Sequence, residues 1–451
     1  MNTIRIRNAR VYNSYTQSFE EKSVLIRGEQ FVQLQETEEE MRQKVDQEID
    51  AQGRWMLPGL IDIHMHVESS MTIPTEFSRQ ALSFGVTTVV ADPHEIANVF
   101  GLKGIEAFMD SEPVMDIFYG IPSSVPSTNP DCETTGGVIG LEEVEKLLDH
   151  PQIRCLGEVM NFKELVSEDE TLIKQIIALC RKKRPLLPLE GHCPKISSAD
   201  LAKFIASGVN ADHTQQTPES IVEKITNGMF LEMQGKSINP DTIRTLVDHQ
   251  FYEYFSLVTD DVMPDHFLHG HLNQVLLSAV KCGLPMEKAI YCSTFTSARR
   301  MHLDDRGVIA PGKLADFVLL DSLEDWEVHQ VYKNGILVSE PKTGFAATEK
   351  PVSFPQEFYH SLQHRPLTAE DFVIRVASET QSVLVHGIEI NPQATFTRLI
   401  RTQLPVKNGV VQWQDSGLAL IACIERYGKG GHIALAFTQG GIHKQGAVAS
   451  S

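Results

Sequence analysis

The sequence predicts an α/β protein built around a (β/α)8 barrel, with a small composite β domain made from both flanks and a C-terminal β-rich region. Two observations carry this prediction. From Leu57 onward, near-continuous apolar runs alternate with amphipathic helical stretches, as in a parallel sheet covered by helices. In addition, polar side chains suited to chemistry stand at the ends of six of these runs. Active sites of (β/α)8 barrels form at the carboxyl ends of the strands.

Eight apolar runs are predicted as the barrel strands. They are Leu57–His66, Val86–Asp92, Met115–Pro122, Ile153–Met160, Pro185–His192, Gly208–His213, Gly228–Gln234 and Tyr254–Asp260. The spacers show helical periodicity, for example in Leu141–Leu148 and Leu172–Leu179. Eight strand–helix units over roughly 250 residues suit a barrel. Periodicity alone leaves a doubly wound open sheet as the rival fold.

Both flanks have strand character. The runs Ile4–Val11, Ser23–Arg27 and Phe31–Leu34 alternate apolar and polar residues, and Gly312–Leu320 and Val328–Val338 return to strand-and-turn patterns. The domains expected are residues 1–56 with 311–340 as a composite β domain, 57–310 as the barrel, and 357–451 as a C-terminal domain after a linker at 341–356.

The C-terminal region also has β-rich patterning. Its candidate strands are Val383–Val385, Val410–Trp413 and Leu418–Cys423. Short runs of this kind, rich in β-branched and apolar residues, are typical of strands.

Composition excludes several classes of partner. The 451 residues carry a formal net charge of −19, which repels duplex nucleic acid and anionic membranes. The N-terminus lacks the apolar core of a signal peptide, and no run is long enough to span a bilayer. The seven cysteines form no Cys-x-x-Cys pair, which favours a reducing cytoplasm. Cys193, beside His192, is interpreted as a small buried residue rather than a ligand.

Two histidines close the first run. His64 and His66 stand two residues apart, so on a strand they project to one face and can converge on a metal ion. Two imidazoles suit zinc, iron or manganese, and added carboxylates favour the harder ions. Taken alone, the pair is equally compatible with two hydrogen-bonded histidines in a crowded barrel end.

Further polar residues at run ends complete a ligand set. Glu158 can bridge two ions, and His192 and His213 are the natural ligands of a second ion. Asp260, preferred over Asp261, can bind metal, accept a proton from water and pass it to a leaving group. A lone histidine is more often a satisfied core residue, but this many candidates at matching positions favour a metal centre.

Glu95 is a second acid/base candidate. It lies in Asp92-Pro-His-Glu95 after the second run, where Pro93 stiffens the turn. We expect Glu95 to face the pocket. As a bare sequence, Pro-His-Glu is also an ordinary loop.

Motifs along the chain extend beyond the ligands themselves. They are Pro58–Met71 (PGLIDIHMHVESSM), Asp92–Val99 (DPHEIANV), Gly157–Met160 (GEVM), Gly191–Pro194 (GHCP), Thr259–Asp261 (TDD) and Ala310–Asp316 (APGKLAD). Together they resemble the adenine deaminases of the amidohydrolase superfamily, over nearly the whole chain. The runs HVESSM and DPHEI are far more specific than the His-x-His shared by the superfamily.

The resemblance implies hydrolytic deamination of adenine to hypoxanthine and ammonia at two divalent ions, manganese or iron, with zinc as the alternative. It implies His64, His66 and Asp260 at one ion, His192 and His213 at the other, and Glu158 as the bridge. A hydroxide between the ions would attack purine C6, while Glu95 and Asp260 move protons to the ring nitrogen and the departing amine. We expect a small purine substrate, no nucleic acid or membrane partner, and a homo-oligomer.

Three places depart from the family pattern. Thr214 replaces a glutamate, Met233-Gln-Gly-Lys236 replaces Arg-Glu-Gly-Ser, and Val262 replaces an arginine. Lost partners for a polar purine weaken or redirect recognition. Another purine, cyclic amidine or lactam therefore remains an alternative substrate.

The end of the chain is a further departure. The chain ends at Ser451, where relatives continue. We therefore expect a truncated C-terminal domain with an open sheet edge. A catalytically silent relative is the third hypothesis, against which the intact ligand set argues.

Overall fold

The structure is a computed structural model that describes residues 2–34, 37, 39–341, 344–345, 352–377, 379–391 and 397–441. The chain divides into two compact units, Met1–Asn129 with Gly137–Ser353, and Pro130–Gly136 with Phe354–Ser451. The predicted linker lies partly outside the described residues, and the chain end at 442–451 lies wholly outside them. Within the described residues, no helix has the length and apolar character needed to cross a bilayer.

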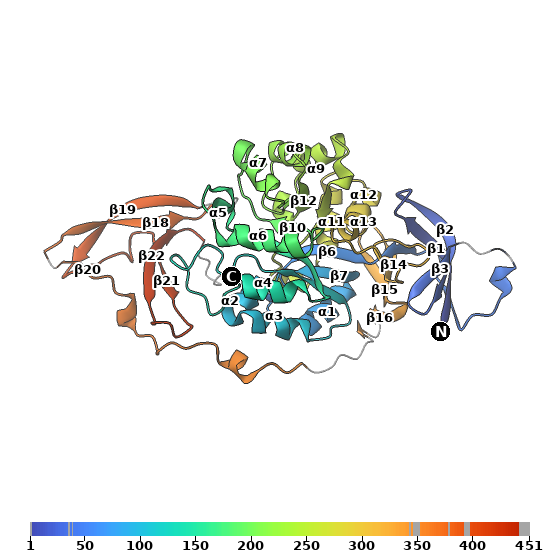
Figure 1. The fold of residues 1–451 in the computed structure, drawn as a ribbon, viewed down its shortest axis with the longest axis horizontal. Coiled ribbons are helices and arrows are strands. Elements are labelled where there is room, and N and C mark those ends of the chain that lie inside the picture. The colour runs from blue at the N-terminus through green and yellow to red at the C-terminus, as the bar shows by residue number, and fades with distance from the viewer. Residues whose placement is uncertain are drawn as a thin grey trace. The chain divides into compact units, whose positions relative to one another are not determined.

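Parallel strands form a barrel in the first unit (Figure 1). They are β6 (Leu60–Met65), β7 (Val86–Ala91), β8 (Asp116–Ile121), β9 (Ile153–Val159), β10 (Leu189–Gly191), β11 (Ala211–Asp212), β12 (Phe230–Met233) and β13 (Phe255–Leu257). The orders are β10-β9-β8-β7-β6 and β11-β12-β13. Asp260 N–H donates to the His64 carbonyl at 3.0 Å and Asn210 N–H to the Leu189 carbonyl at 3.4 Å, which joins the two sheets into a ring. The predicted (β/α)8 barrel is confirmed.

Helices connect the barrel strands and lie around them (Figure 1). They are α1 (Pro74–Ser83), α2 (His94–Phe100), α3 (Leu102–Met109), α4 (Leu141–Leu148), α5 (Phe162–Val166), α6 (Leu172–Lys183), α7 (Ser198–Ala206), α8 (Pro218–Thr226), α9 (Pro240–Asp248), α10 (Pro264–Phe267), α11 (Leu272–Lys281), α12 (Met286–Cys292) and α13 (Phe295–Arg300). In α6, Ile173, Ile176, Ile177 and Cys180 recur at helical spacing and are buried. The helices therefore cover the barrel with apolar stripes.

The first predicted barrel strand, Leu57–His66, is in fact two strands. β5 (Trp55–Pro58) pairs with β1 and β14 in a separate sheet, and β6 begins at Leu60. Gly59 separates them, and a Cβ there would lie 2.2 Å from the Thr87 hydroxyl oxygen, so only glycine permits this approach. A continuous apolar run hides such a change of sheet, because both strands are buried.

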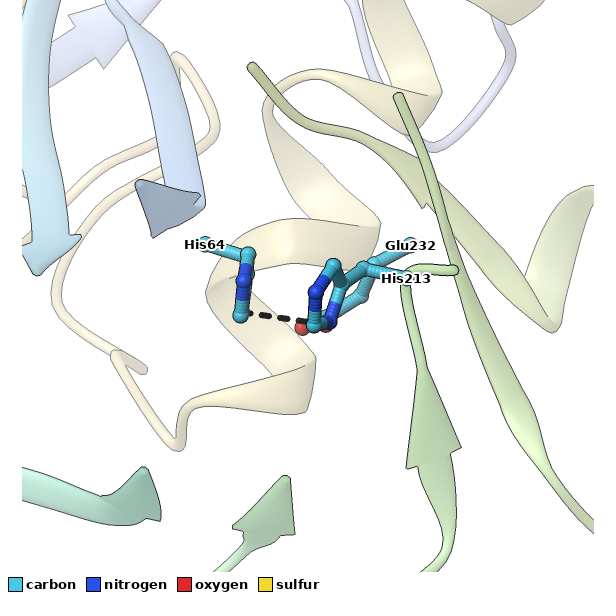
Figure 2. A group of neighbouring side chains, drawn as sticks. All are labelled: His64, His213 and Glu232. Carbon is cyan, nitrogen blue, oxygen red and sulfur yellow. Dashed lines mark ion pairs between the residues drawn. The ribbon is translucent and has the colours of Figure 1, made fainter. Parts of the chain in front are cut away.

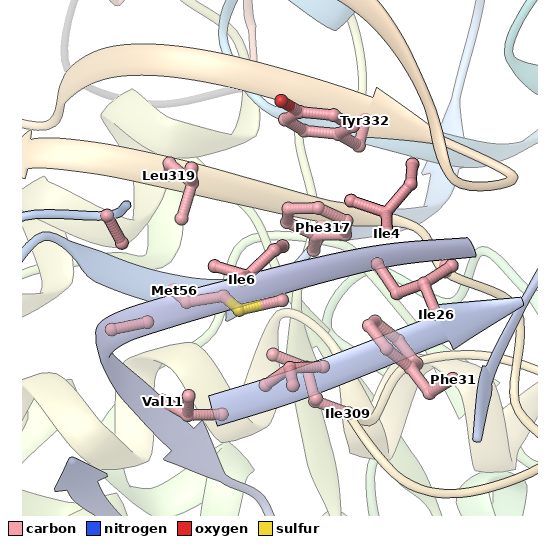
Figure 3. Close-up of a cluster of buried hydrophobic side chains, with 14 residues drawn as sticks. Ile4, Ile6, Val11, Ile26, Phe31, Met56, Ile309, Phe317, Leu319 and Tyr332 are labelled. Carbon is pink, nitrogen blue, oxygen red and sulfur yellow. The ribbon is translucent and has the colours of Figure 1, made fainter. Parts of the chain in front are cut away.

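Strands from both ends of the first unit pair in one nine-stranded sheet, ordered β17-β16-β15-β14-β5-β1-β2-β3 with β4 beside β1. Their bounds are β1 (Thr3–Asn13), β2 (Ser18–Arg27), β3 (Gln30–Leu34), β4 (Gln47–Asp50), β14 (Phe317–Ser322), β15 (Glu327–Lys333), β16 (Ile336–Glu340) and β17 (Gly344–Phe345). Figure 3 shows its apolar core, in which the Phe317 and Tyr332 rings stack at 4.4 Å between centroids. This core anchors β5, the strand that leads into β6.

The second unit contains a five-stranded sheet ordered β20-β19-β18-β22-β21. Its strands are β18 (Ser382–Glu389), β19 (Arg398–Lys407), β20 (Val410–Val411), β21 (Ala419–Ile424) and β22 (Ile433–Gln439). Leu404, Val411, Leu418 and Phe437 form its buried cluster. Two of these strands, β19 and β22, were not among those expected from the sequence.

Candidate functional site

The six ligand residues predicted from the sequence all lie at the carboxyl ends of barrel strands. His64 is on β6 and Glu158 on β9, while His66, His192, His213 and Asp260 stand just after β6, β10, β11 and β13. Five of them are buried, and the sixth, His192, has a side chain that is 36% exposed. His192 therefore stands at the solvent side of the cluster.

Glu158 lies between two groups of histidines. Its Oε1 is 3.7 Å from His66 Nε2, whereas its Oε2 is 2.7 Å from His192 Nδ1 and 3.2 Å from His213 Nε2. Burial raises the pKa of this carboxyl, but His213 and His192 outweigh burial and hold the pKa well below its ordinary value. Each oxygen of the carboxylate thus faces a different set of imidazoles.

Asp260 directs one oxygen into the site. Its φ of 60° is unusual for a non-glycine residue, and its backbone is held by the hydrogen bond to the His64 carbonyl. Gln234 Nε2 donates to Asp260 Oδ2 at 2.7 Å, while Oδ1 lies 3.5 Å from His66 Nε2. The neighbouring Asp261 is exposed and accepts a hydrogen bond from the Ser69 hydroxyl. Of the two aspartates, Asp260 is therefore the buried one beside the histidines.

Backbone groups orient His66 and Glu158. His66 Nδ1 lies 2.9 Å from the Asp92 carbonyl, an acceptor, so Nδ1 carries the proton and Nε2 faces the cluster. The Asp92 carboxylate accepts the Glu158 N–H at 2.9 Å. A Cβ on Gly157 would lie 2.3 Å from that carboxylate, so glycine is required beside Glu158.

This donor set fits divalent cations. Two triads, His64–His66–Glu158 and Glu158–His192–His213, each offer ligand atoms within 4.8 Å of one another, and both contain Glu158. His64 Nε2 is buried and has no hydrogen-bond partner among the described residues. Burial lowers the pKa of His66, but Glu95 and Asp260 raise it well above its ordinary value. A negative potential that stabilises an imidazolium also stabilises a metal ion.

Known proteins with matching sequences identify the family. The model of the Amidohydrolase family matches residues 55–338, and that of the Adenine deaminase C-terminal domain matches residues 394–451. "Adenine deaminase 2" of Oenococcus oeni is 50% identical over 448 residues, which span 99% of this chain and 78% of that protein. The chain belongs to the adenine deaminase family of amidohydrolases. The adenine deaminase of Clostridium perfringens is 49% identical over 449 residues, again 99% of this chain and 78% of the relative.

Solved structures agree with the amidohydrolase fold. The β-aspartyl dipeptidase of Fervidobacterium islandicum superposes with a TM-score of 0.59 at 18% identity, covering 78% of this chain and 100% of the dipeptidase. An enamidase of the amidohydrolase superfamily also gives 0.59, at 15% identity, with 77% and 99% covered. At such identities the likeness concerns the barrel architecture.

In this adenine deaminase family member, Glu95 lies beside the ligand set. It is in the first turn of α2, with its oxygens 3.6 Å from His66 Nδ1 and 3.7 Å from His94 Nε2. Both oxygens are buried without a hydrogen-bond partner among the residues described. Glu68 is nearby, and burial together with Glu95 raises its pKa to about 8. Glu95 is therefore open to a further hydrogen-bonding group.

The sequence-based prediction did not include three residues that the structure places in the site. His94 lies 3.6 Å from Glu158 Oε1, and although burial lowers its pKa, Glu95 raises the pKa to about 10. Gln234 contacts Asp260, as described above. Glu232 is fully buried, 3.5 Å from His64 Nδ1 (Figure 2). Two features of the sequence could have indicated these residues. Glu232 is a carboxyl residue inside the apolar run Gly228–Gln234, and His94 lies within the motif Asp92–Val99.

Most of the residues that depart from the family pattern contact other residues of the protein interior. The Thr214 hydroxyl donates to Asp212 Oδ2 at 2.8 Å, and Met233 is fully buried. Neighbours on a strand face opposite sides, so Met233 points away from the side that Glu232 occupies. Val262 is half-buried. In the Met233–Lys236 stretch, Gln234 provides the contact to the ligand set.

Proposed function

We propose that this chain hydrolyses adenine to hypoxanthine and ammonia with the help of two divalent cations. The observation that carries the proposal is Glu158, whose two oxygens face separate histidine groups in a barrel of the amidohydrolase family. Relatives named adenine deaminase, identical at about half of the aligned positions along 99% of this chain, support adenine as the substrate.

The proposed ligands divide between the two ions. His64, His66 and Asp260 would hold one ion, His192 and His213 the other, and Glu158 would contact both. When bound, such ions supply Lewis acidity and lower the pKa of water toward neutrality. Imidazoles mixed with carboxylates favour manganese or iron, with zinc as the alternative.

The proton-transfer roles fall to Asp260 and Glu95. Gln234 donates to Asp260 Oδ2, so Oδ1, which lies 3.5 Å from His66 Nε2, is the oxygen directed into the site where the reacting water would bind. Glu95 has two oxygens without partners among the described residues, so it can exchange a proton with a substrate nitrogen. We propose that Asp260 accepts a proton from water and delivers it to the departing amine. Glu95 transfers a proton to a nitrogen of the purine ring.

Ammonia release from adenine by protein loaded with manganese or iron tests this function. The proposal predicts stoichiometric ammonia and hypoxanthine from adenine. No release of ammonia from adenine by the metal-loaded protein would contradict it.

A second candidate changes only the substrate. The departures at Thr214, Met233 and Val262 motivate another purine, a cyclic amidine or a lactam. A panel of purines, pyrimidines and lactams separates the two candidates through the ratio of kcat/KM values. Metal analysis separates both from a catalytically silent relative, which would hold no ion.

Three further expectations remain predictions. The described cysteines are all free, which fits a reducing cytoplasm. A homo-oligomer is expected, and light scattering measures its order. The domain limits 1–56 with 311–340, 57–310 and 357–451 are tested by limited proteolysis.

A further inference from the structure

Glu232 is a buried carboxyl group placed directly behind the proposed metal ligands. It lies on β12 and is 0% exposed, and neither oxygen has a hydrogen-bond partner among the described residues. Its Oε2 is 3.5 Å from His64 Nδ1. Burying a carboxyl group costs free energy unless neighbouring groups compensate for it, so this placement calls for a physical reason.

The two histidine rings next to Glu232 share one orientation. His64 and His213 stack with ring centroids 3.8 Å apart and an angle of 22° between planes. Figure 2 shows the Glu232 carboxylate at one edge of this stacked pair. Each ring offers a nitrogen that lies within 4.8 Å of the Glu232 ligand atom. Glu232 is therefore next to both rings at once.

The other nitrogens of these rings face the centre of the site. His213 Nε2 is 3.2 Å from Glu158 Oε2, and His64 Nε2 is 4.0 Å from Asp260 Oδ1. His213 Nδ1 is buried without a hydrogen-bond partner among the described residues. For both rings, Nε2 is thus turned toward the proposed metal ligands, which leaves Nδ1 as the nitrogen available to Glu232.

A buried ion pair of Arg300 and Glu190 contributes to the electrostatic surroundings of Glu232. Arg300 Nε and Nη2 donate to Glu190 Oε1 at 3.1 and 2.7 Å, and the charges of both Glu190 and Arg300 act on the carboxyl group of Glu232. Arg300 is only 11% exposed and Glu190 2%. Arg300 and Glu190 therefore form a buried ion pair in the electrostatic surroundings of Glu232, whose Oε2 lies beside His64.

We propose that Glu232 is a positioning residue that accepts Nδ1–H from the His64–His213 pair and so holds each Nε2 toward the metal centre. The neutral imidazole has one donor and one acceptor nitrogen, so an acceptor at Nδ1 leaves the Nε2 lone pair for a cation. Such partners of ligating histidines fix the tautomer and raise metal affinity. The inference rests on the proposed metal centre, but not on adenine as the substrate.

Two variants of Glu232 and one control test this role. Glu232→Met removes the acceptor at similar volume. Glu232→Gln keeps a carbonyl oxygen for His64 and an amide N–H for Glu190. Ser256→Ala, at the residue that pairs in register with Glu232 on β13, is the control, because Ser256 is equally buried and makes no side-chain hydrogen bond within the described part of the chain.

The readout is the affinity of chelator-treated protein for Mn²⁺, with the absorption spectrum of the Co²⁺-loaded protein as a second measure. We expect Glu232→Met to lower Mn²⁺ affinity about 10- to 100-fold. Its Co²⁺ spectrum should also change, a signature that a loss of stability alone would not produce. Glu232→Gln should restore most of the affinity, and Ser256→Ala should match the unaltered protein.

Two results would overturn the role. One is a folded Glu232→Met protein with unchanged Mn²⁺ affinity and Co²⁺ spectrum; the other is a Glu232→Gln protein as weak as Glu232→Met. If Glu232→Met does not fold, long-range ¹H–¹⁵N NMR of the unaltered Zn²⁺-loaded protein decides. Protonated Nδ1 on His64 supports the role, and metal-bound Nδ1 contradicts it. Because no assay here contains adenine, failure of adenine turnover would contradict the proposed function alone.

Discussion

At the scale of single residues, the site is built from charges that neighbours compensate. Glu158 is buried among imidazoles that hold its pKa well below its ordinary value, despite the opposing effect of burial. Asp260 is fixed through one oxygen by Gln234, which leaves the other facing His66. Each carboxylate therefore has one defined orientation, as a ligand or a proton acceptor requires.

Glu95 gives the first prediction. Replacing Glu95 with glutamine removes an acid/base group but keeps its shape, so kcat for adenine should fall about 10²- to 10⁴-fold. Metal content, measured by elemental analysis, should stay the same, because Glu95 is not a proposed ligand. Glu106→Gln, on the exposed face of α3, is the matched control. An unchanged kcat in Glu95→Gln would contradict the proposed acid/base role of Glu95.

The buried pair of Lys224 and Asp212 gives the second prediction. Lys224 Nζ lies 2.7 Å from Asp212 Oδ2, and their side chains are 2% and 0% exposed. Lys224→Met leaves the Asp212 charge without its cation, although Thr214 and Gln216 still donate to it. The free energy of unfolding should fall by about 3 kcal/mol in a denaturant titration. No change would show that the pair contributes no net stability.

The same variant has a defined pH dependence. Burial raises the pKa of Asp212, but Lys224 and His213 hold it well below its ordinary value. A carboxyl group of this kind stabilises the fold above its unfolded pKa of about 3.9, and this stability is lost as pH falls through the folded pKa. The difference in unfolding free energy between Lys224→Met and the unaltered protein should therefore be larger at neutral pH than below about pH 4. A difference that widened in acid would contradict this assignment.

At the scale of elements, β9 links packing to chemistry through Gly157. The Cβ of Gly157→Ala would displace the Asp92 carboxylate from the Glu158 N–H, because the two would lie only 2.3 Å apart. We expect a loss of about 1–3 kcal/mol in unfolding free energy and weaker Mn²⁺ binding. Gly235→Ala has open space around its Cβ and serves as the control. Equal Mn²⁺ affinity in both variants would show that the hydrogen bond between Asp92 and the Glu158 N–H does not orient Glu158 for metal binding.

The sequence was most informative where an element has one strong pattern. The helix predicted at Leu141–Leu148 has those same bounds in α4, and the apolar run at Ile153 became β9. The sequence prediction failed where two elements share a pattern, as at Trp55–Pro58, because a buried inner strand of the nine-stranded sheet and a barrel strand look alike. In the second unit, β19 and β22 alternate exposed and half-buried residues, so their apolar signal is weak.

The candidate site shows the same limit. His64 and His66 were visible because their spacing of two places them on one face of a strand. The roles of His94 and Glu232 depend on which residues of other strands lie beside them. Distances such as the 3.5 Å from Glu232 to His64 arise from the closure of the barrel, and no local pattern encodes them.

At the scale of the whole molecule, metal binding should stabilise the fold. The proposed ligands come from β6, β9, β10, β11 and β13 or the residues just after them, so bound ions would tie both parallel sheets of the barrel together. A ligand that binds only the folded state at 100 times its Kd adds about 2.7 kcal/mol per site. Chelation should therefore lower the melting temperature, and manganese should restore it. An identical melting temperature with and without the ion would contradict a metal centre of this extent.

The most direct test of the account is hydrolysis of adenine in H₂¹⁸O by the manganese- or iron-loaded protein, followed by mass spectrometry. Hydrolytic deamination predicts hypoxanthine carrying one ¹⁸O, with ammonia in equal amount, and no product from protein lacking Asp260 or Glu158. The absence of hypoxanthine, or hypoxanthine without the label, would contradict the central claim.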